Sequence, residues 1–277
     1  MKTALVAVSI LAASAAEARP VLNHVYVVLD QATFDAMRND PRVTQLLGPS
    51  DAGLPDYAPP RADADRIFLR GRATYLELFA PKNRFNEPVG KVGVAIAEDR
   101  PHDFEHIAKR WQIHCPTSFY RATVAWTRSQ PPIPWYDSIQ CDETAVRKDL
   151  SIWAMVYKPA FGRWQTGSQT TARRAILAPR RTAGQGQFDV TGLDLAIPAA
   201  DQKRIAQQLT AAGLIPEDRG GRTVFRGDGW SINLRSANIT SAAVTAIRMR
   251  VRTTPKSALR LGNSVLKSGW RKAALTF

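Results

Sequence analysis

The sequence lacks the short motifs by which many common enzymes are recognised. It contains no G-x-S-x-G, H-E-x-x-H, phosphate-binding loop or paired C-x-x-C motif, so the usual hydrolase and nucleotide-binding classes have no support. It also has no apolar run long enough for a membrane-spanning helix. Histidine and cysteine are scarce, with 4 and 2 residues in 277. Any reactive site must therefore be argued from a few individual side chains.

The first eighteen residues are typical of a secretory signal peptide. Lys2 gives a positive start, an apolar run follows, and Ala16-Glu17-Ala18 is a small-x-small cleavage site. We expect cleavage after Ala18 and a mature protein that is periplasmic or secreted. No cysteine lies near the cleavage site, so we do not expect a lipid anchor there.

The two cysteines, Cys115 and Cys141, allow two interpretations. In an oxidising compartment they could form a disulfide, which would stabilise the fold by about 3–4 kcal/mol through loop closure. They could equally be two isolated thiols, and their spacing is not that of a zinc site. The sequence alone leaves both alternatives open.

Positive charge is concentrated in the C-terminal part of the chain. Residues 1–165 carry 20 Lys and Arg against 18 Asp and Glu, whereas residues 166–277 carry 18 against 6. Such an excess often indicates a polyanionic partner. Because we expect export, anionic envelope material is a better candidate than nucleic acid. The alternative is a solvated basic surface that has no dedicated partner.

Three arginines of the basic region indicate where an anion could bind. Arg248, Arg250 and Arg252 alternate along a predicted strand, so they should project from one face of it. Like charges placed side by side repel each other and do not face an apolar core. We therefore expect all three to face water or an anion, as an anion-binding surface.

The pattern of apolar residues predicts four related α+β units in the mature chain. Each begins with a strand, and the first three continue with a helix and a hairpin. Arg70-Gly71 before Leu76-Glu77-Leu78 recurs as Arg226-Gly227 before Ile232-Asn233-Leu234. The fourth unit has predicted strands but no helix. We expect a first domain over 19–165, a linker or irregular surface loop over 166–185, and a second, partly degenerate pair of units over 186–277.

This plan resembles that of the vicinal-oxygen-chelate superfamily, which includes glyoxalases and extradiol dioxygenases. The segment LNHVYVVLD is similar to the opening strand of that superfamily, and TYLELFAP to its metal-bearing last strand. The resemblance implies paired βαβββ units that form half-open barrels of mixed sheet. More narrowly, LNHVYVVLD, WAMVYKPAF and the C-terminal LRLGNSVLKSGWRKAALTF resemble a family of exported bacterial proteins without an assigned activity.

The resemblance implies a site at His24 and Glu77. In the superfamily, the first and last strands of each unit provide His and Glu ligands for a metal. Tyr26 and Tyr75 share the faces of these two residues in the predicted strands. A carboxylate inside an otherwise apolar strand must be paired, metal-bound or protonated. Three alternatives to a metal site remain. The first, which we favour over the metal, is a hydrogen-bonded His24–Glu77 pair that orients a ligand or acts as a weak acid/base couple. The others are His24 as an ordinary core histidine, and Glu77 neutralised by an arginine such as Arg66 or Arg121.

The remaining units do not complete a metal site. We match the ligand positions to Val94 and Val156 in the second unit, and to Leu195 and Asn233 in the third. Catalytic zinc normally has three protein ligands, so we expect no cofactor, although a divalent metal remains an option.

Three functions follow from these patterns. The first is an exported protein that binds a small or anionic ligand in a barrel cleft without turnover. The second is a metal-dependent lyase, isomerase or dioxygenase of the vicinal-oxygen-chelate type. The third is an envelope-associated protein that binds a polyanion.

Overall fold

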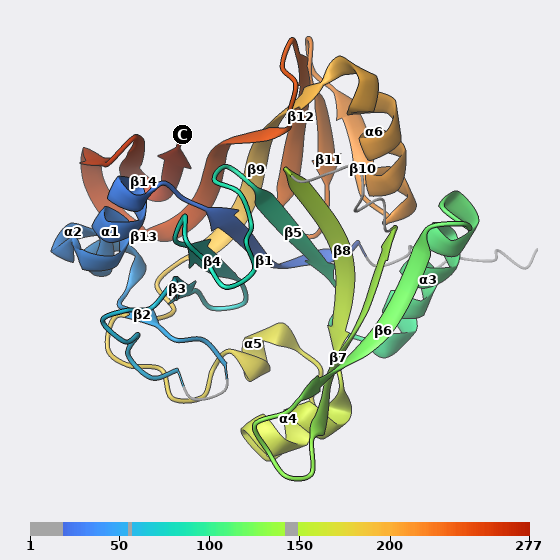
Figure 1. Cartoon of the computed structure of the whole chain (residues 1–277), viewed down its shortest axis with the longest axis horizontal. Helices are drawn as coiled ribbons and strands as arrows, with labels where there is room; N and C mark the ends of the chain where they lie inside the picture. The colour runs from blue at the N-terminus through green and yellow to red at the C-terminus, as the bar shows by residue number, and fades with distance from the viewer. Residues whose placement is uncertain (1–18, 55–56, 142–148) are drawn as a thin grey trace, which may run out of the picture.

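A computed structural model describes residues 19–54, 57–141 and 149–277. The expected signal peptide lies outside these residues. These residues form two mixed sheets, one of eight strands and one of six (Figure 1). In the described part of the chain, no helix is long and apolar enough to cross a membrane.

The first two units form the eight-stranded sheet, in the order β2-β3-β4-β1-β5-β8-β7-β6. Strand β1 lies at its centre, parallel to β4 and antiparallel to β5. The elements of unit one are β1 (Val21–Val28), α1 (Gln31–Asn39), α2 (Pro41–Leu47), β2 (Ser50–Asp51), β3 (Arg66–Arg70) and β4 (Tyr75–Phe79). Those of unit two are β5 (Val92–Ala97), α3 (Pro101–His114), β6 (Phe119–Trp126), β7 (Ile133–Cys141) and β8 (Leu150–Tyr157). Both units therefore have the βαβββ order that the sequence predicted.

The third and fourth units form the six-stranded sheet, in the order β10-β11-β12-β9-β13-β14. Unit three comprises β9 (Asp189–Pro198), a 3-10 turn η1 (Ala199–Asp201), α6 (Gln202–Ala211), β10 (Ile215–Asp218), β11 (Thr223–Arg226) and β12 (Ser231–Ala237). Unit four is a hairpin of β13 (Ala243–Leu261) and β14 (Ser264–Thr276) without a helix. The neighbours of β9 in this sheet match those of β1 in the first, which confirms the repeated plan.

One hydrophobic core includes side chains from both sheets. Val25 of β1 and Leu195 of β9 belong to it, as do side chains of α3 and α6. The indole of Trp111 in α3 donates a hydrogen bond to the carbonyl of Gln208 in α6, at 3.2 Å. Alternation along β1 places His24 and Tyr26 on the face opposite this core. That second face of the eight-stranded sheet is the one that carries the cavity described below.

The segment 166–185 contributes buried side chains, although we expected a linker or an irregular surface loop. It follows α4 (Pro159–Thr166) and contains α5 (Arg173–Ile176). Arg173 is buried and pairs with Asp99 at 2.9 Å. Ile176 and Leu177 are almost completely buried. The segment is therefore tied to the first sheet, while the division into two domains remains a prediction.

Glu98, at the end of β5, should make stability depend on pH. It is 5% exposed, and burial, together with Asp103 and Asp99, raises its pKa to about 8. Because the folded-state pKa exceeds that of the unfolded chain, the native state holds a proton that the unfolded state releases, and stability falls as the pH rises from about 4.5 to 8. We expect Glu98→Gln to raise the free energy of unfolding at pH 7 by about 1–3 kcal/mol.

Urea unfolding of Glu98→Gln and of the wild type, measured at pH 5 and pH 7.5, tests this expectation. The difference between the two proteins should be small at the lower pH and grow at the higher one. An equal difference at both pH values would show that Glu98 is ionised in the folded protein.

Candidate functional site

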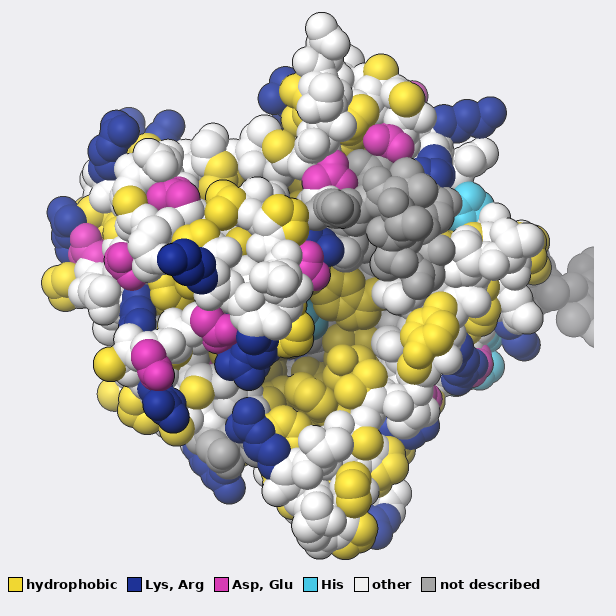
Figure 2. All heavy atoms as spheres, viewed as in Figure 1, with side chains coloured by type: hydrophobic (Ala, Val, Ile, Leu, Met, Phe, Trp, Pro, Cys, Tyr) yellow, Lys and Arg dark blue, Asp and Glu magenta, His cyan; other side chains and the backbone are white. Residues whose placement is uncertain are grey.

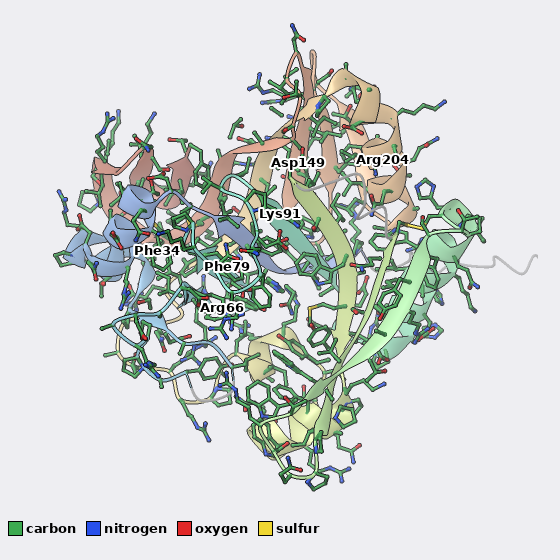
Figure 3. All side chains as sticks on the ribbon, in the orientation of Figure 1. Phe34, Arg66, Phe79, Lys91, Asp149 and Arg204 are labelled. Carbon is green, nitrogen blue, oxygen red and sulfur yellow. A yellow bond between two sulfur atoms is a disulfide. The ribbon has the colours of Figure 1, made fainter. Side chains whose placement is uncertain are left out.

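A cavity of about 440 Å³ opens on the face of the eight-stranded sheet that lies away from the core. Its walls come from both units and from Leu177, and about half of the lining residues are Phe, Tyr or Trp. Figure 2 shows this hollow as a hydrophobic surface with Lys and Arg side chains beside its edge. Figure 3 places Arg66 and Phe79 near the centre of the same view. The size is within the range of pockets for small molecules.

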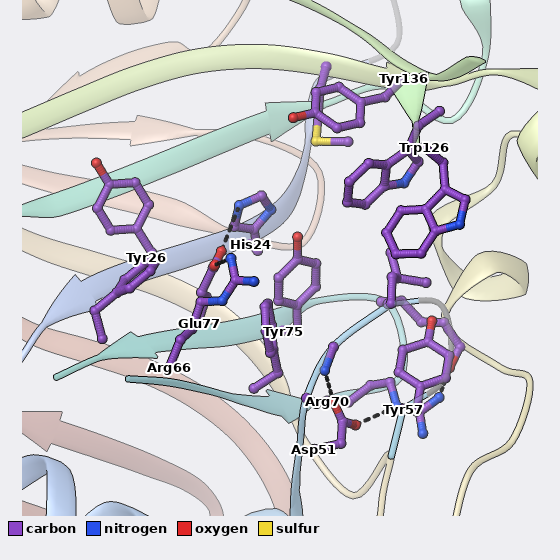
Figure 4. Close-up of a pocket in the computed structure, with 18 of the residues that line it drawn as sticks. His24, Tyr26, Asp51, Tyr57, Arg66, Arg70, Tyr75, Glu77, Trp126 and Tyr136 are labelled. Carbon is purple, nitrogen blue, oxygen red and sulfur yellow. Dashed lines mark hydrogen bonds and ion pairs between the residues drawn. The ribbon is translucent and has the colours of Figure 1, made fainter. Parts of the chain in front are cut away.

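Strand register brings the predicted residues of unit one to this cavity (Figure 4). In the parallel pair of β1 and β4, His24 lies opposite Tyr75, and Tyr26 lies opposite Glu77. Paired residues in a ladder point to the same face of the sheet, and all four line the cavity. Tyr26 lies over Gly93 of β5, where a Cβ atom would come within 1.9 Å of its ring. Any larger residue at position 93 would therefore displace Tyr26.

His24 is held as a neutral imidazole. Its Nδ1 atom lies 2.8 Å from Oδ1 of Asn23, and the ring stacks on Tyr75 with the centroids 4.3 Å apart. Trp153 meets the same ring edge-on at 5.2 Å. Burial lowers the pKa of His24 to about 3, so the ring is uncharged at neutral pH. With Nδ1 donating to Asn23, Nε2 keeps its lone pair.

Glu77 is neutralised by an arginine. Arg66 donates a hydrogen bond to Oε1 of Glu77 at 2.8 Å, whereas Nε2 of His24 lies 3.8 Å from Oε2. Burial raises the pKa of Glu77, and the guanidinium of Arg66 opposes that shift. Arg66 also lies over the ring of Phe68, 4.9 Å from its centroid. Of the alternatives left open by the sequence, pairing with Arg66 describes this geometry, and Arg121 instead pairs with Glu105.

The residues present do not fit the metal that the resemblance implies. The described residues contain no group of three or more His, Cys, Asp or Glu that could hold a metal ion. The guanidinium of Arg66 already lies against the one carboxylate next to His24, and its positive charge would oppose a second cation there. We derive no chemistry through a metal at this site.

The assignment of Val94 and Val156 to ligand positions was wrong. Both are buried in the core between the sheets. The cavity face of β5 and β8 instead carries Ala95, which pairs with His24 and Trp153. Both strands are apolar on both faces, so alternation could not show which residues faced the cavity. The corrected positions still provide no metal ligand.

Leu195 was also misassigned in the third unit, because it lies in the core. The equivalent of the cavity face carries Asp194, opposite Asn233 of β12. Asn233 donates to the Asp194 carboxylate at 2.6 Å. Arg248 of β13 pairs with the same carboxylate at 3.1 Å and donates to the carbonyl oxygens of Leu193 and Ser231. A charged cluster therefore replaces the aromatic floor found in the first sheet.

The three arginines of β13 do not share one environment. Arg248 is only partly exposed and is held by Asp194. Arg250 is exposed and lies 4.0 Å from Asp189. Arg252 is exposed and has no ion pair among the described residues. The expectation that all three face water or an external anion was wrong for Arg248, because Asp194 lies beside it.

Sequence reasoning missed two parts of the cavity. Trp126, Trp135 and Trp153 line it from β6, β7 and β8, and the only available signal was that Trp153 and Tyr157 share one face of β8. The other missed part is Arg70, which is 1% exposed and pairs with Asp51 at 3.2 Å. Its guanidinium lies 3.4 Å from the ring centroid of Tyr57.

Cys115 and Cys141 form a disulfide, with their Cα atoms 5.8 Å apart. This decides between the two alternatives that the sequence left open. The bond links the end of α3 to the end of β7.

Comparison with known proteins places the chain in a family. The model of one protein family matches residues 22–276. The chain belongs to DUF5829, a family of unknown function. No curated protein sequence matches this DUF5829 chain.

Solved structures resemble this chain at very low sequence identity. A hypothetical protein from Staphylococcus aureus is similar at a TM-score of 0.54 and 6% identity, over 88% of this chain and 96% of that one. BphC, a halotolerant catechol dioxygenase, has a TM-score of 0.48 and 11% identity, over 91% of this chain and 83% of that one. A 2,2',3-trihydroxybiphenyl 1,2-dioxygenase from Sphingomonas wittichii has a TM-score of 0.49 and 10% identity, over 90% of this chain and 86% of that one. At such identities the likeness concerns the fold alone.

Proposed function

We propose that this protein binds a flat, mainly apolar small molecule with one acidic group in the aromatic cavity, without chemical turnover. The observation that carries the proposal is the lining itself. Tyrosine, tryptophan and phenylalanine rings surround the space, and such rings bind planar ligands by stacking and edge contacts. The aromatic floor extends from Tyr26 to Trp153, whose ring centroids are 5.8 Å apart.

The charges of the lining favour a single negative group on the ligand. Three carboxylates line the cavity, and each has a cation beside it: Arg70 for Asp51, Arg66 for Glu77 and Lys91 for Glu87. Arg128 is exposed, lines the cavity and lies 5.3 Å from the ring centroid of Trp126. Among the described residues it has no acidic partner. It is therefore the lining cation best placed to meet an anionic substituent.

We propose that the cavity catalyses no reaction because His24 of β1 and Glu77 of β4 are poorly suited to acid–base chemistry. The Glu77 carboxylate is held by Arg66, and the Nε2 atom of His24 lies too far from it for proton exchange through a direct hydrogen bond. With a pKa of about 3, His24 is also a weak base at neutral pH.

Export is proposed together with this binding role. A disulfide persists in oxidising compartments, and the chain has one, which supports the expected removal of residues 1–18 and a periplasmic or secreted location. The mass of the N-terminal peptide of the protein recovered outside the cytoplasm tests this.

The binding role is tested by titration calorimetry with two probes, naphthoate and its neutral analogue naphthalenemethanol. We expect Trp153→Leu to weaken naphthoate binding about 5–10-fold, because stacking contributes about 1 kcal/mol beyond area burial. We expect Arg128→Gln to weaken naphthoate by a similar factor and to leave the neutral probe unchanged.

Trp270→Leu is the matched control, because Trp270 is exposed and does not line the cavity. It should change neither affinity. Failure of both probes to bind the wild type below about 1 mM, which is only about 4 kcal/mol of binding free energy, would contradict the proposed function.

A further inference from the structure

The C-terminal hairpin contains many basic residues and no acidic ones. We call β13, β14 and their connecting turn the basic hairpin. No acidic residue occurs after Asp228, whereas the basic hairpin contains these cations: Arg248, Arg250, Arg252, Lys256, Arg260, Lys267, Arg271 and Lys272. The chain's own acids therefore neutralise little of this charge.

Six of these cations are both exposed and without an acidic partner among the described residues. Only Arg248 and Arg250 have one, in Asp194 and Asp189. The others are Arg252, Lys256, Arg260, Lys267, Arg271 and Lys272. A set of cations that the fold leaves unpaired is suited to an external anionic surface.

Strand register places part of this charge on one face. Leu259 pairs with Leu266, and both are buried. The next residues along each strand therefore point the opposite way. Arg260 and Lys267 lie on that exposed face as diagonal neighbours, because Ala258 pairs with Lys267 and Arg260 pairs with Val265.

An exposed tryptophan lies in the same hairpin. Trp270 is 72% exposed and has a φ of 53°, the left-handed region that bulky residues rarely adopt. It lies opposite Thr254, where the register of the two strands shifts. Arg271 and Lys272 follow it directly. A tryptophan beside cations is typical of protein surfaces that meet lipid headgroups, since the ring is apolar and its N–H is polar.

The far end of the hairpin is held against the helices of unit one. It curls away from the rest of the six-stranded sheet to lie beside α1 and α2 (Figure 1). The backbone N–H of Asn263 in its turn donates to Oγ1 of Thr33 in α1 at 3.1 Å. This hydrogen bond anchors the turn of the hairpin, so the exposed face of the hairpin is held in place even when no partner is bound. None of the hairpin's residues lines the cavity.

We propose that the basic hairpin docks the protein on an anionic lipid bilayer, with Trp270 at the headgroup level and the exposed face that carries Arg260 and Lys267 against lipid phosphates. This is independent of the cavity and its ligand. Nucleic acid could also meet cations and a tryptophan, but the expected export separates the protein from it.

The test is co-sedimentation of the full chain with vesicles. We expect binding to equal mixtures of phosphatidylglycerol and phosphatidylcholine, little binding to phosphatidylcholine alone, and loss of binding between about 0.05 and 0.5 M salt. The Arg260→Gln/Lys267→Gln variant should bind about 10–30-fold more weakly, as expected for two cations at a membrane surface. Trp270→Ala should weaken binding roughly fivefold.

The control variant is Lys109→Gln/Lys203→Gln, which removes the same charge from exposed positions on α3 and α6. It should bind nearly as well as the wild type, and thermal unfolding should be unchanged in all variants because the replaced side chains are exposed. Equal losses in both double variants, equal binding to the two kinds of vesicle, or binding to single-stranded DNA without binding to vesicles would overturn the proposal.

Discussion

Replacing Arg70 with methionine should lower the free energy of unfolding by about 3–5 kcal/mol, the usual cost of removing one partner from a buried ion pair. Arg70 is almost completely buried, and its guanidinium donates to the carbonyl oxygens of Leu177, Pro179 and Arg180. It also pairs with Asp51. Methionine fills the volume but removes the cation beside the Asp51 carboxylate, which keeps only the neutral donors of Gly53 and Gln185. It also removes the donor to three carbonyl groups.

The loss should grow with pH. Burial already raises the pKa of Asp51, and Arg70 opposes that shift. Without Arg70 the folded-state pKa rises further above the unfolded value. The native state then holds a proton that the unfolded chain releases, so the variant loses stability as the pH rises above about 4. Urea unfolding at pH 5 and pH 7 should therefore show the larger deficit at pH 7.

Arg226 provides a control within the same chain. It occupies the equivalent place in the third unit, before Gly227, but its side chain is 40% exposed and pairs with the exposed Glu217. Arg226→Met should change stability far less, because exposed ion pairs contribute little. Similar losses in the two variants would mean that the buried pair has no special role.

Removing the disulfide should cost about 3 kcal/mol. The bond closes a loop with a sequence separation of 26 residues, and the chain-entropy model assigns a loop of this length about 3–4 kcal/mol. We expect the Cys115→Ser/Cys141→Ser variant to lose that much in urea unfolding. Wild-type protein unfolded with a reducing agent should lose a similar amount.

Comparison under reducing conditions separates the cross-link from side-chain packing. Cys115 is buried and contacts the carbonyl of Trp111, so a serine there could have its own effect. If the cross-link is the cause, the reduced wild type and the double variant should agree within about 1 kcal/mol. A stable reduced wild type beside an unstable variant would assign the loss to packing instead.

Part of the site could be predicted from the sequence. The resemblance implied that the strands of His24 and Glu77 meet, and alternation along each strand gave the side chains that share their faces; both residues line the cavity. The choice between Arg66 and Arg121 could not be made in this way. Arg66 pairs with Phe79, two residues from Glu77 on the same face, and only the register of β3 against β4 makes them neighbours.

Local order along the chain determined the repeated units, the charge imbalance and the faces of amphipathic strands, because each depends on residues that are close in sequence. The tertiary structure alone decided which distant residues meet. Arg70 contacts carbonyl groups of residues 177–180, and Asp194 neutralises Arg248. Where a strand is apolar on both faces, as β5 is, its sequence fits either orientation equally well. The register against β1 then decides that Ala95, and not Val94, faces the cavity.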